Sequence, residues 1–290
     1  MISAKGCLKI RELRHTKKRI PLQWRFTLSF LTITTDFGTK DGFVGTMKVV
    51  IWKICPEVQI ADITHEIAPQ NVQEGAIALW RAYSFFPDGT VHVAVVDPGV
   101  GTLRRPIAAK LGTQYFVAPD NGLLTPMIED AEQKGLAVQF VHLTNQKFWL
   151  QDVSHTFHGR DIFAPVGAYL ARGVKLAELG PAITDVKRLP LPRPEKTAAG
   201  WKAQISVIDI FGNLTTNLPA SAVEGSDNPT FHLKGIEIKG LVASYGHRQP
   251  GEWVALIDSE GFIEIAVVNG SGAKKLGAQV GDTVEVIINK

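Results

Sequence analysis

The sequence lacks the features that define several large classes of protein. Its 290 residues include only two cysteines, Cys7 and Cys55, which excludes a disulfide scaffold and a cysteine-rich zinc module. It contains no run of eighteen or more apolar residues, so no membrane-spanning helix is predicted. Hydrophobic residues make up 45% and charged residues 20%, a balance that excludes a disordered chain. We therefore expect a globular protein with a large core.

Positive charge is scarce outside the first 25 residues. Residues 1–25 hold eight lysines and arginines and one acid, which leaves 23 basic and 27 acidic residues in the remainder. This mildly acidic body lacks the basic face of a nucleic-acid-binding protein. The basic segment leads into no apolar stretch with a small-residue cleavage site. We interpret 1–25 as a disordered arm and expect a cytoplasmic protein.

The first half of the chain alternates between two hydrophobic patterns. Residues 44–54 and 72–83 have helical spacing, and Asn71 with Glu74 resembles a capping box before the second of these helices. Strand-like segments rich in β-branched residues flank them at 26–35, 57–65, 90–101 and 114–122. Strand–helix–strand order predicts a parallel sheet, so we expect an α/β domain over 26–185, with a further helix near 163–172.

The pattern changes after residue 185. Pro190, Pro192 and Pro194 fall within 186–199, which we interpret as a stiff linker. Short strands with turn residues between them fill 200–290, and no long helical period remains. The second domain is therefore predicted to be a smaller all-β sandwich or barrel.

Polar residues follow the predicted strands of the first domain. Asp36, Asp97 and Asp120 each lie at the end of a strand, and ligands of open parallel sheets bind beyond these ends. Each aspartate alone could be a turn former. Their convergence predicts one shared crevice. Histidines and acids there could suit a metal, but HExxH and paired-cysteine spacings are absent, so none is predicted. GxSxG, GxGxxG and GxxxxGKS motifs are also missing.

Six motifs occur in a characteristic order: TTDFGTKDGFVGTMK, ADITHEI, VDPGVGTLRR, APDNGLL, TFHGRDIFAP and DIFGNLTTN. Together they resemble the S-adenosyl-L-methionine (SAM) hydroxide adenosyltransferases, relatives of fluorinase and chlorinase, over about 31–290. The resemblance implies an N-terminal α/β domain and a C-terminal β domain in a homotrimer with active sites between subunits. It also implies hydrolysis of SAM at the 5′ carbon to adenosine and L-methionine, with no cofactor and neither nucleic acid nor membrane as a partner.

The resemblance implies roles for individual residues. Asp97, Arg104 and His158 match the catalytic triad: we expect Asp97 and His158 to position a water and accept its proton, while Arg104 fixes Asp97. For the ribose, the implied contacts are Asp36 at the hydroxyls and Phe157 at the ring or the reacting carbon. For adenine, they are Asn213, Tyr245 stacked on the base, and the backbone of Val267–Asn269 at its edge. For the methionine part, they are Ser259 at the carboxylate and Asp41 with Asp209 at the ammonium group.

Three positions depart from fluorinase. Gly159 stands where fluorinase has a halide-contacting serine, Glu260 follows Ser259 where fluorinase has arginine, and Phe43 replaces a serine near the amino group. Gly159 disfavours halide adenosyl transfer because a hydrogen-bond donor is missing. A non-catalytic adenosyl- or nucleoside-binding module remains the main alternative to a hydrolase.

Overall fold

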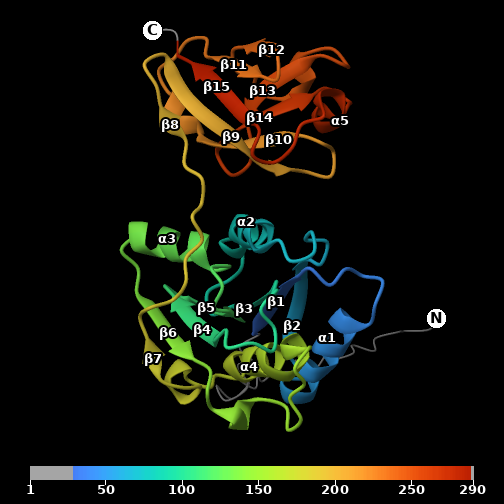
Figure 1. Cartoon of the computed structure of the whole chain (residues 1–290), viewed down its shortest axis with the longest axis vertical. Coiled ribbons are helices and arrows are strands. Elements are labelled where there is room, and N and C mark those ends of the chain that lie inside the picture. Colours follow the sequence, from blue (N-terminus) through green and yellow to red (C-terminus); the bar gives the residue numbers. More distant parts are fainter. Residues whose placement is uncertain (1–28, 289–290) are drawn as a thin grey trace, which may run out of the picture.

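Two sheets, one in each half of the chain, form the framework of the molecule (Figure 1). The computed structural model describes residues 29–288, so the predicted arm at 1–25 lies outside the described residues. None of the helices between residues 29 and 288 is both long and apolar enough to cross a membrane.

The first sheet has seven strands in the order β2-β1-β3-β5-β4-β6-β7. Its parallel strands are β1 (Phe30–Thr35), β2 (Gln59–Thr64), β3 (Val91–Val95) and β5 (Gln114–Pro119). These four confirm the predicted parallel sheet. Three antiparallel strands that the sequence did not predict complete it: β4 (Pro106–Leu111), β6 (Val138–His142) and β7 (Ala182–Ile183).

Helices cover both faces of this sheet. The longer ones are α1 (Phe43–Ile54), α2 (Val72–Tyr83), α3 (Thr125–Gln133) and α4 (Ala164–Ala171). One buried cluster joins α1 and α4 to the sheet, and a second joins α2 and α3 to it. As predicted, Asn71 caps α2: its side chain accepts from the Glu74 amide at 3.1 Å and donates to the Glu74 carboxylate at 3.1 Å. Shorter helical turns are Gln146–Phe148, Gly159–Phe163, Leu176–Glu178, Ala220–Val223 and Tyr245–His247.

The second half forms an antiparallel, nearly closed barrel, which confirms the predicted β domain. Its elements are β8 (Glu195–Lys196), β9 (Gly200–Ile208), β10 (Leu214–Pro219), β11 (Thr230–Leu233), β12 (Ile236–Lys239), β13 (Trp253–Ile257), β14 (Phe262–Val267), α5 (Gly272–Leu276) and β15 (Thr283–Ile287). Phe231 and Ile263 are among the residues that fill its core.

A segment without helix or strand, 184–194, joins the two sheets. The Lys187 amide donates to Asp120 Oδ1 at 2.8 Å, and the Leu189 amide donates to Thr125 Oγ1 at 2.8 Å. These bonds fix the connection against the α/β domain. Helices α2 and α3 lie on the side of that domain that faces the barrel in Figure 1.

Candidate active site

Asp97, Arg104 and His158 lie in direct contact. Asp97 lies two residues after the buried end of β3, Arg104 lies two residues before β4, and His158 immediately precedes the π-helical turn that leads into α4. Arg104 Nε donates to Asp97 Oδ1 at 2.9 Å, and Arg104 Nη2 donates to Asp97 Oδ2. The same Nη2 lies 3.0 Å from His158 Nδ1. The structure thus brings the three residues of the predicted triad into one cluster.

The guanidinium of Arg104 is held in a buried position. The side chains of Arg104 and Asp97 are each 5% exposed. The guanidinium carbon lies 5.2 Å from the centre of the Phe163 ring, a cation–π contact. Its Nη1 is buried and has no hydrogen-bond partner among the described residues. One charged donor of the cluster is therefore available to a small polar molecule.

His158 is a neutral ring whose protonation pattern follows from its neighbour. Arginine can only donate, so Nδ1 of His158 accepts from Arg104 and the proton lies on Nε2. Burial, together with the charge of Arg104, lowers the pKa of His158 below 6.5, against opposing effects of Asp97, Asp161 and a hydrogen bond to the Ser154 backbone. At neutral pH, His158 is therefore neutral, and the Ser154 backbone accepts the hydrogen bond from its ring N–H.

The three strand-end aspartates do not share one set of contacts. Asp36 Oδ2 accepts from the amide of Gln70 at 2.8 Å, and Gln70 has a left-handed backbone with φ of 67°. Asp120 instead accepts two bonds from Arg105 and one from the linker amide of Lys187. The carboxylate of Asp120 therefore anchors the linker and pairs with Arg105, whereas Asp97 pairs with Arg104.

Three phenylalanines pack against each other beside this cluster. Phe37 follows Asp36, Phe43 begins α1, and Phe157 precedes His158. Their ring centres are 5.2–5.9 Å apart and each pair of rings meets edge to face. We call this group the aromatic corner. Phe43 had been noted in the sequence only as a departure from fluorinase.

Gly159 packs tightly against the aromatic corner. A Cβ atom at position 159 would lie 3.2 Å from the Phe157 ring and 3.3 Å from both the Phe37 ring and Met47 Sδ. Such distances are shorter than about nine in ten Cβ contacts in proteins, so the neighbouring atoms would have to shift by a few tenths of an ångström. A serine here would therefore require two rings and a methionine to move.

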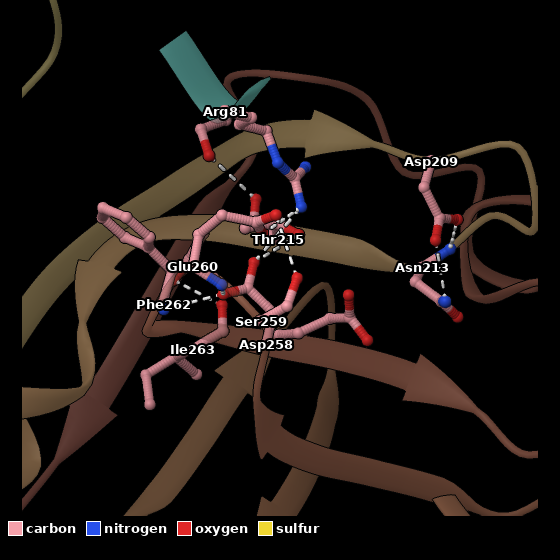
Figure 2. A network of polar contacts seen from close by, with 12 residues as sticks. Arg81, Asp209, Asn213, Thr215, Asp258, Ser259, Glu260, Phe262 and Ile263 are labelled. Atoms are coloured by element: carbon pink, nitrogen blue, oxygen red, sulfur yellow. Dashed lines mark hydrogen bonds and ion pairs between the residues drawn. The ribbon is translucent and has the colours of Figure 1, made fainter. Parts of the chain in front are cut away.

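The predicted adenine contact Asn213 lies in the β domain, in a turn ordered by Asp209 (Figure 2). Asp209 accepts from the Asn213 amide at 2.8 Å, from the Asn213 side chain at 2.9 Å and from the Phe211 amide at 2.9 Å. Asp209 thus organises the turn that presents Asn213. Asp41, which the sequence pairs with Asp209 at the ammonium group, is exposed just before α1 in the other domain.

The other predicted adenine contacts belong to the same barrel. Tyr245 is exposed, and its hydroxyl donates to Glu264 Oε1 at 2.6 Å. Burial raises the pKa of Glu264. Val267 ends β14 and Asn269 follows it with a left-handed φ of 52°.

Ser259 lies in a turn to which the α/β domain also contributes. Its hydroxyl donates to Glu260 at 2.9 Å. Figure 2 shows Arg81, from α2, reaching this turn, and its Nη2 lies 2.5 Å from Glu260 and 3.5 Å from Asp258. Burial acts to raise the pKa of Glu260, but the hydrogen bond from Arg81 outweighs this effect and the pKa is lowered. Sequence reasoning missed Arg81, because no local pattern links it to a residue 179 positions away.

No group of three or more histidine, cysteine, aspartate or glutamate side chains within the described residues is arranged to hold a metal ion. The Asp97 cluster itself consists of a carboxylate, a guanidinium and a neutral imidazole.

Comparison with known proteins gives agreeing results for both halves of the chain. Models of the SAM hydroxide adenosyltransferase N-terminal and C-terminal domains match residues 31–180 and 203–285. A protein of Salinispora tropica named (R)-S-adenosyl-L-methionine hydrolase is 40% identical, over 89% of this chain and 97% of the relative. A fluorinase of Actinoplanes is 31% identical, over 67% and 73% of the two chains.

A solved structure shares the fold as well. The crystal structure of an uncharacterized conserved protein from Thermotoga maritima is 38% identical, with a TM-score of 0.81, and covers 90% of this chain and 99% of the other. The two domain models together match well over half of the sequence. The chain therefore belongs to the SAM hydroxide adenosyltransferase family.

Proposed function

We propose that this protein hydrolyses SAM to adenosine and L-methionine, by attack of water or hydroxide on the 5′ carbon. The observation that carries the proposal is the contact between Asp97, Arg104 and His158 in a chain of this family. Four curated relatives at 34–40% identity are named (R)-S-adenosyl-L-methionine hydrolase. We extend that specificity for the R configuration at sulfur to this chain.

The geometry assigns a role to each member of the cluster. Asp97 accepts the proton of the water, because its two oxygens keep lone pairs after accepting from Arg104. The unpaired Nη1 of Arg104 orients the water oxygen, and His158, which is hydrogen-bonded to the Ser154 backbone, holds Arg104 in position. In the proposed reaction Asp97 alone accepts the proton, whereas the sequence predicted that Asp97 and His158 both accept it.

The charge of the leaving group supports these roles. SAM carries a sulfonium cation, and methionine leaves from it as a neutral thioether, so the positive charge at sulfur decreases in the transition state. A buried site favours this loss of charge. The remaining difficulty is the weakness of water as a nucleophile, which the cluster addresses through proton removal and orientation.

Adenosine release from purified protein tests the proposal. Asp97→Asn should lower kcat by ~10²–10⁴-fold with little change in KM, because it removes the proton acceptor but keeps the shape. Asp120→Asn is the matched control: this strand-end aspartate also pairs with an arginine but lies outside the cluster, so turnover should persist. Equal turnover of wild type and Asp97→Asn would contradict the mechanism. Separate assays of the R and S epimers test the proposed specificity.

We also propose that the active enzyme is a homotrimer whose β domain completes the site of a neighbouring copy. The predicted adenine contacts are in the barrel, whereas the catalytic cluster is in the α/β domain. Large apolar side chains are exposed in both places: Leu103 fully, Ile210 at 94% and Phe211 at 72%. Exposed apolar groups of this size favour a protein partner. The cytoplasmic location stays a prediction from the sequence.

The halide-transfer alternative is disfavoured because Gly159 offers no side-chain hydrogen-bond donor to a halide. A serine at that position would meet the aromatic corner at contacts of 3.2–3.3 Å. Formation of 5′-halo-adenosine in chloride or fluoride would contradict this reading. A binding module without turnover would release no adenosine in the same assay.

A further inference from the structure

A buried carboxylate, Asp161, closes the loop that carries His158. Asp161 is fully buried, and its Oδ2 accepts from the Ser154 amide at 2.8 Å and from the Ser154 hydroxyl at 2.7 Å. Arg160 Nε donates to the other oxygen at 2.5 Å. Burial acts to raise the pKa of Asp161, but the bonds from Arg160 and Ser154 outweigh it and lower the pKa. The loop 154–161 is therefore tied at its two ends by an ionised group.

Ser154 connects this carboxylate to the ring of His158. Its hydroxyl, which donates to Asp161, also accepts from the Phe157 amide at 3.1 Å. Its backbone accepts from the ring N–H of His158, whose Nδ1 lies 3.0 Å from Arg104 Nη2. Both ring nitrogens of His158 are therefore occupied. The place of the Ser154 backbone determines the direction in which the ring faces Arg104.

The loop that carries Asp97 and Arg104 packs against the same segment. Gly101 lies midway along that loop, with a left-handed φ of 76°, and a Cβ atom there would overlap the carbonyl oxygen of His155. A Cβ atom at Gly99 would lie 3.3 Å from Arg104 Cγ. Contacts this close leave little room for one loop to shift alone. A displaced Ser154 would therefore disturb the contact between His158 and Arg104.

We propose that Ser154 and Asp161 are positioning residues of this site: they hold the backbone to which the His158 ring donates, and so fix the ring orientation in which Nδ1 accepts from Arg104. The inference rests on the proposed function for its effect on turnover. Misplacement of a group near the reacting atoms lowers the rate of the chemical step. Loss of this support should therefore lower kcat and leave KM nearly unchanged.

The exchange of the His158 ring proton with solvent measures the support directly. Protein labelled with ¹⁵N at histidine should give an N–H signal for this hydrogen-bonded proton, and His158→Gln assigns the signal by its loss. Ser154→Ala removes the hydroxyl between Asp161 and the Phe157 amide, so exchange should become ~10-fold faster or more. Asp161→Asn, which keeps the shape and removes the charge, should act in the same direction. Ser154→Thr, the matched control, keeps the hydroxyl and should exchange as wild type does.

Adenosine release gives a second measurement. Ser154→Ala should lower kcat by ~3- to 30-fold with KM within about twofold, and Ser154→Thr should restore kcat. If Asp161→Asn does not fold, Ser154→Ala decides the case.

Unchanged exchange of the His158 ring proton in Ser154→Ala would overturn the inference. An equal acceleration of backbone amide exchange throughout the barrel would also overturn it, because it would show a general loss of stability. A wild-type protein with a protected ring proton but no adenosine release would refute the proposed function and leave this inference intact.

Discussion

At the scale of single residues, the main finding is the orientation of His158. Its Nδ1 accepts from Arg104, so the neutral ring is the form that fits the cluster. Protonation would place an N–H against the guanidinium and set two cations side by side. The buried setting and Arg104 both lower the pKa of His158, which keeps the ring neutral around pH 7.

We predict that the activity of wild-type enzyme falls in acid because His158 gains a proton. The active form is deprotonated and its pKa lies below 6.5, so kcat/KM should hold above pH 6.5 and decline as the pH falls through the lowered pKa. The pH profile of His158→Gln is the comparison, since the glutamine oxygen can still accept from Arg104. This variant should be slower but should lose activity only at lower pH. If kcat/KM of wild type and of His158→Gln declined at the same pH, the decline would belong to another titrating group.

One residue-scale prediction concerns the contact between Asp97, Arg104 and His158. The family resemblance carried by the VDPGVGTLRR and TFHGRD motifs implies that these three residues form one group, and the structure shows that they are in contact. The motifs do not indicate which ring nitrogen of His158 accepts a hydrogen bond. They also do not indicate that Asp120 binds the linker. Those facts depend on side-chain directions and on residues 54 and 67 positions apart.

At the scale of elements, a buried network of hydrogen-bonded side chains connects three strands of the first sheet. His92 on β3 accepts from Thr32 Oγ1 on β1 at 2.8 Å and donates to Gln114 Oε1 on β5, while the Gln114 amide donates to the carbonyls of Tyr83 and Phe86 at 3.2 Å. The His92 ring also stacks on Phe116, with ring centres 4.9 Å apart. Burial lowers the pKa of His92 to about 4.

This network predicts a specific loss of stability in acid. Between pH 6.5 and about 4 the unfolded chain protonates His92 and the folded protein does not, so stability declines as the pH falls. The contribution is about 3 kcal/mol by pH 4. Urea unfolding at several pH values should show a shallower decline for His92→Gln, whose amide can donate to Gln114 and accept from Thr32. Parallel curves for the two proteins would show that His92 does not titrate in this way.

Two of the three strands that sequence patterns missed, β4 and β7, share a physical cause. The parallel strands β1, β2 and β3 are rich in β-branched residues and alternate with amphipathic helices, so the pattern predicted them. Strand β4, PIAAKL, begins with proline and has little β-branched content, and β7 is only two residues long. Such strands are specified by pairing with their neighbours in the sheet and not by their own residues.

At the scale of the whole molecule, the two domains meet at a mixed polar and apolar contact. Arg81 of α2 bridges to Glu260 and Asp258, and the Trp80 ring meets the Phe262 ring edge to face at 5.7 Å. These contacts join α2 to the turn that carries Ser259. The contact gives each chain a defined relation between the Asp97 cluster and the Asp209–Asn213 turn, which the proposed closed ring of identical subunits requires.

The proposed trimer predicts that two inactive variants restore each other. Asp97→Asn should disable the half of a site that the α/β domain supplies. Asn213→Ala should disable the half that the barrel supplies. If each site combines one half from each of two copies, trimers reassembled from an equal mixture should contain intact sites at about a quarter of the wild-type number. Adenosine release after co-refolding or co-expression measures this. Asp97→Asn mixed with the Asp97→Asn/Asn213→Ala double variant is the control and should stay inactive. If each chain formed its own complete site, the first mixture would be as inactive as its components, because no copy in it carries both intact halves.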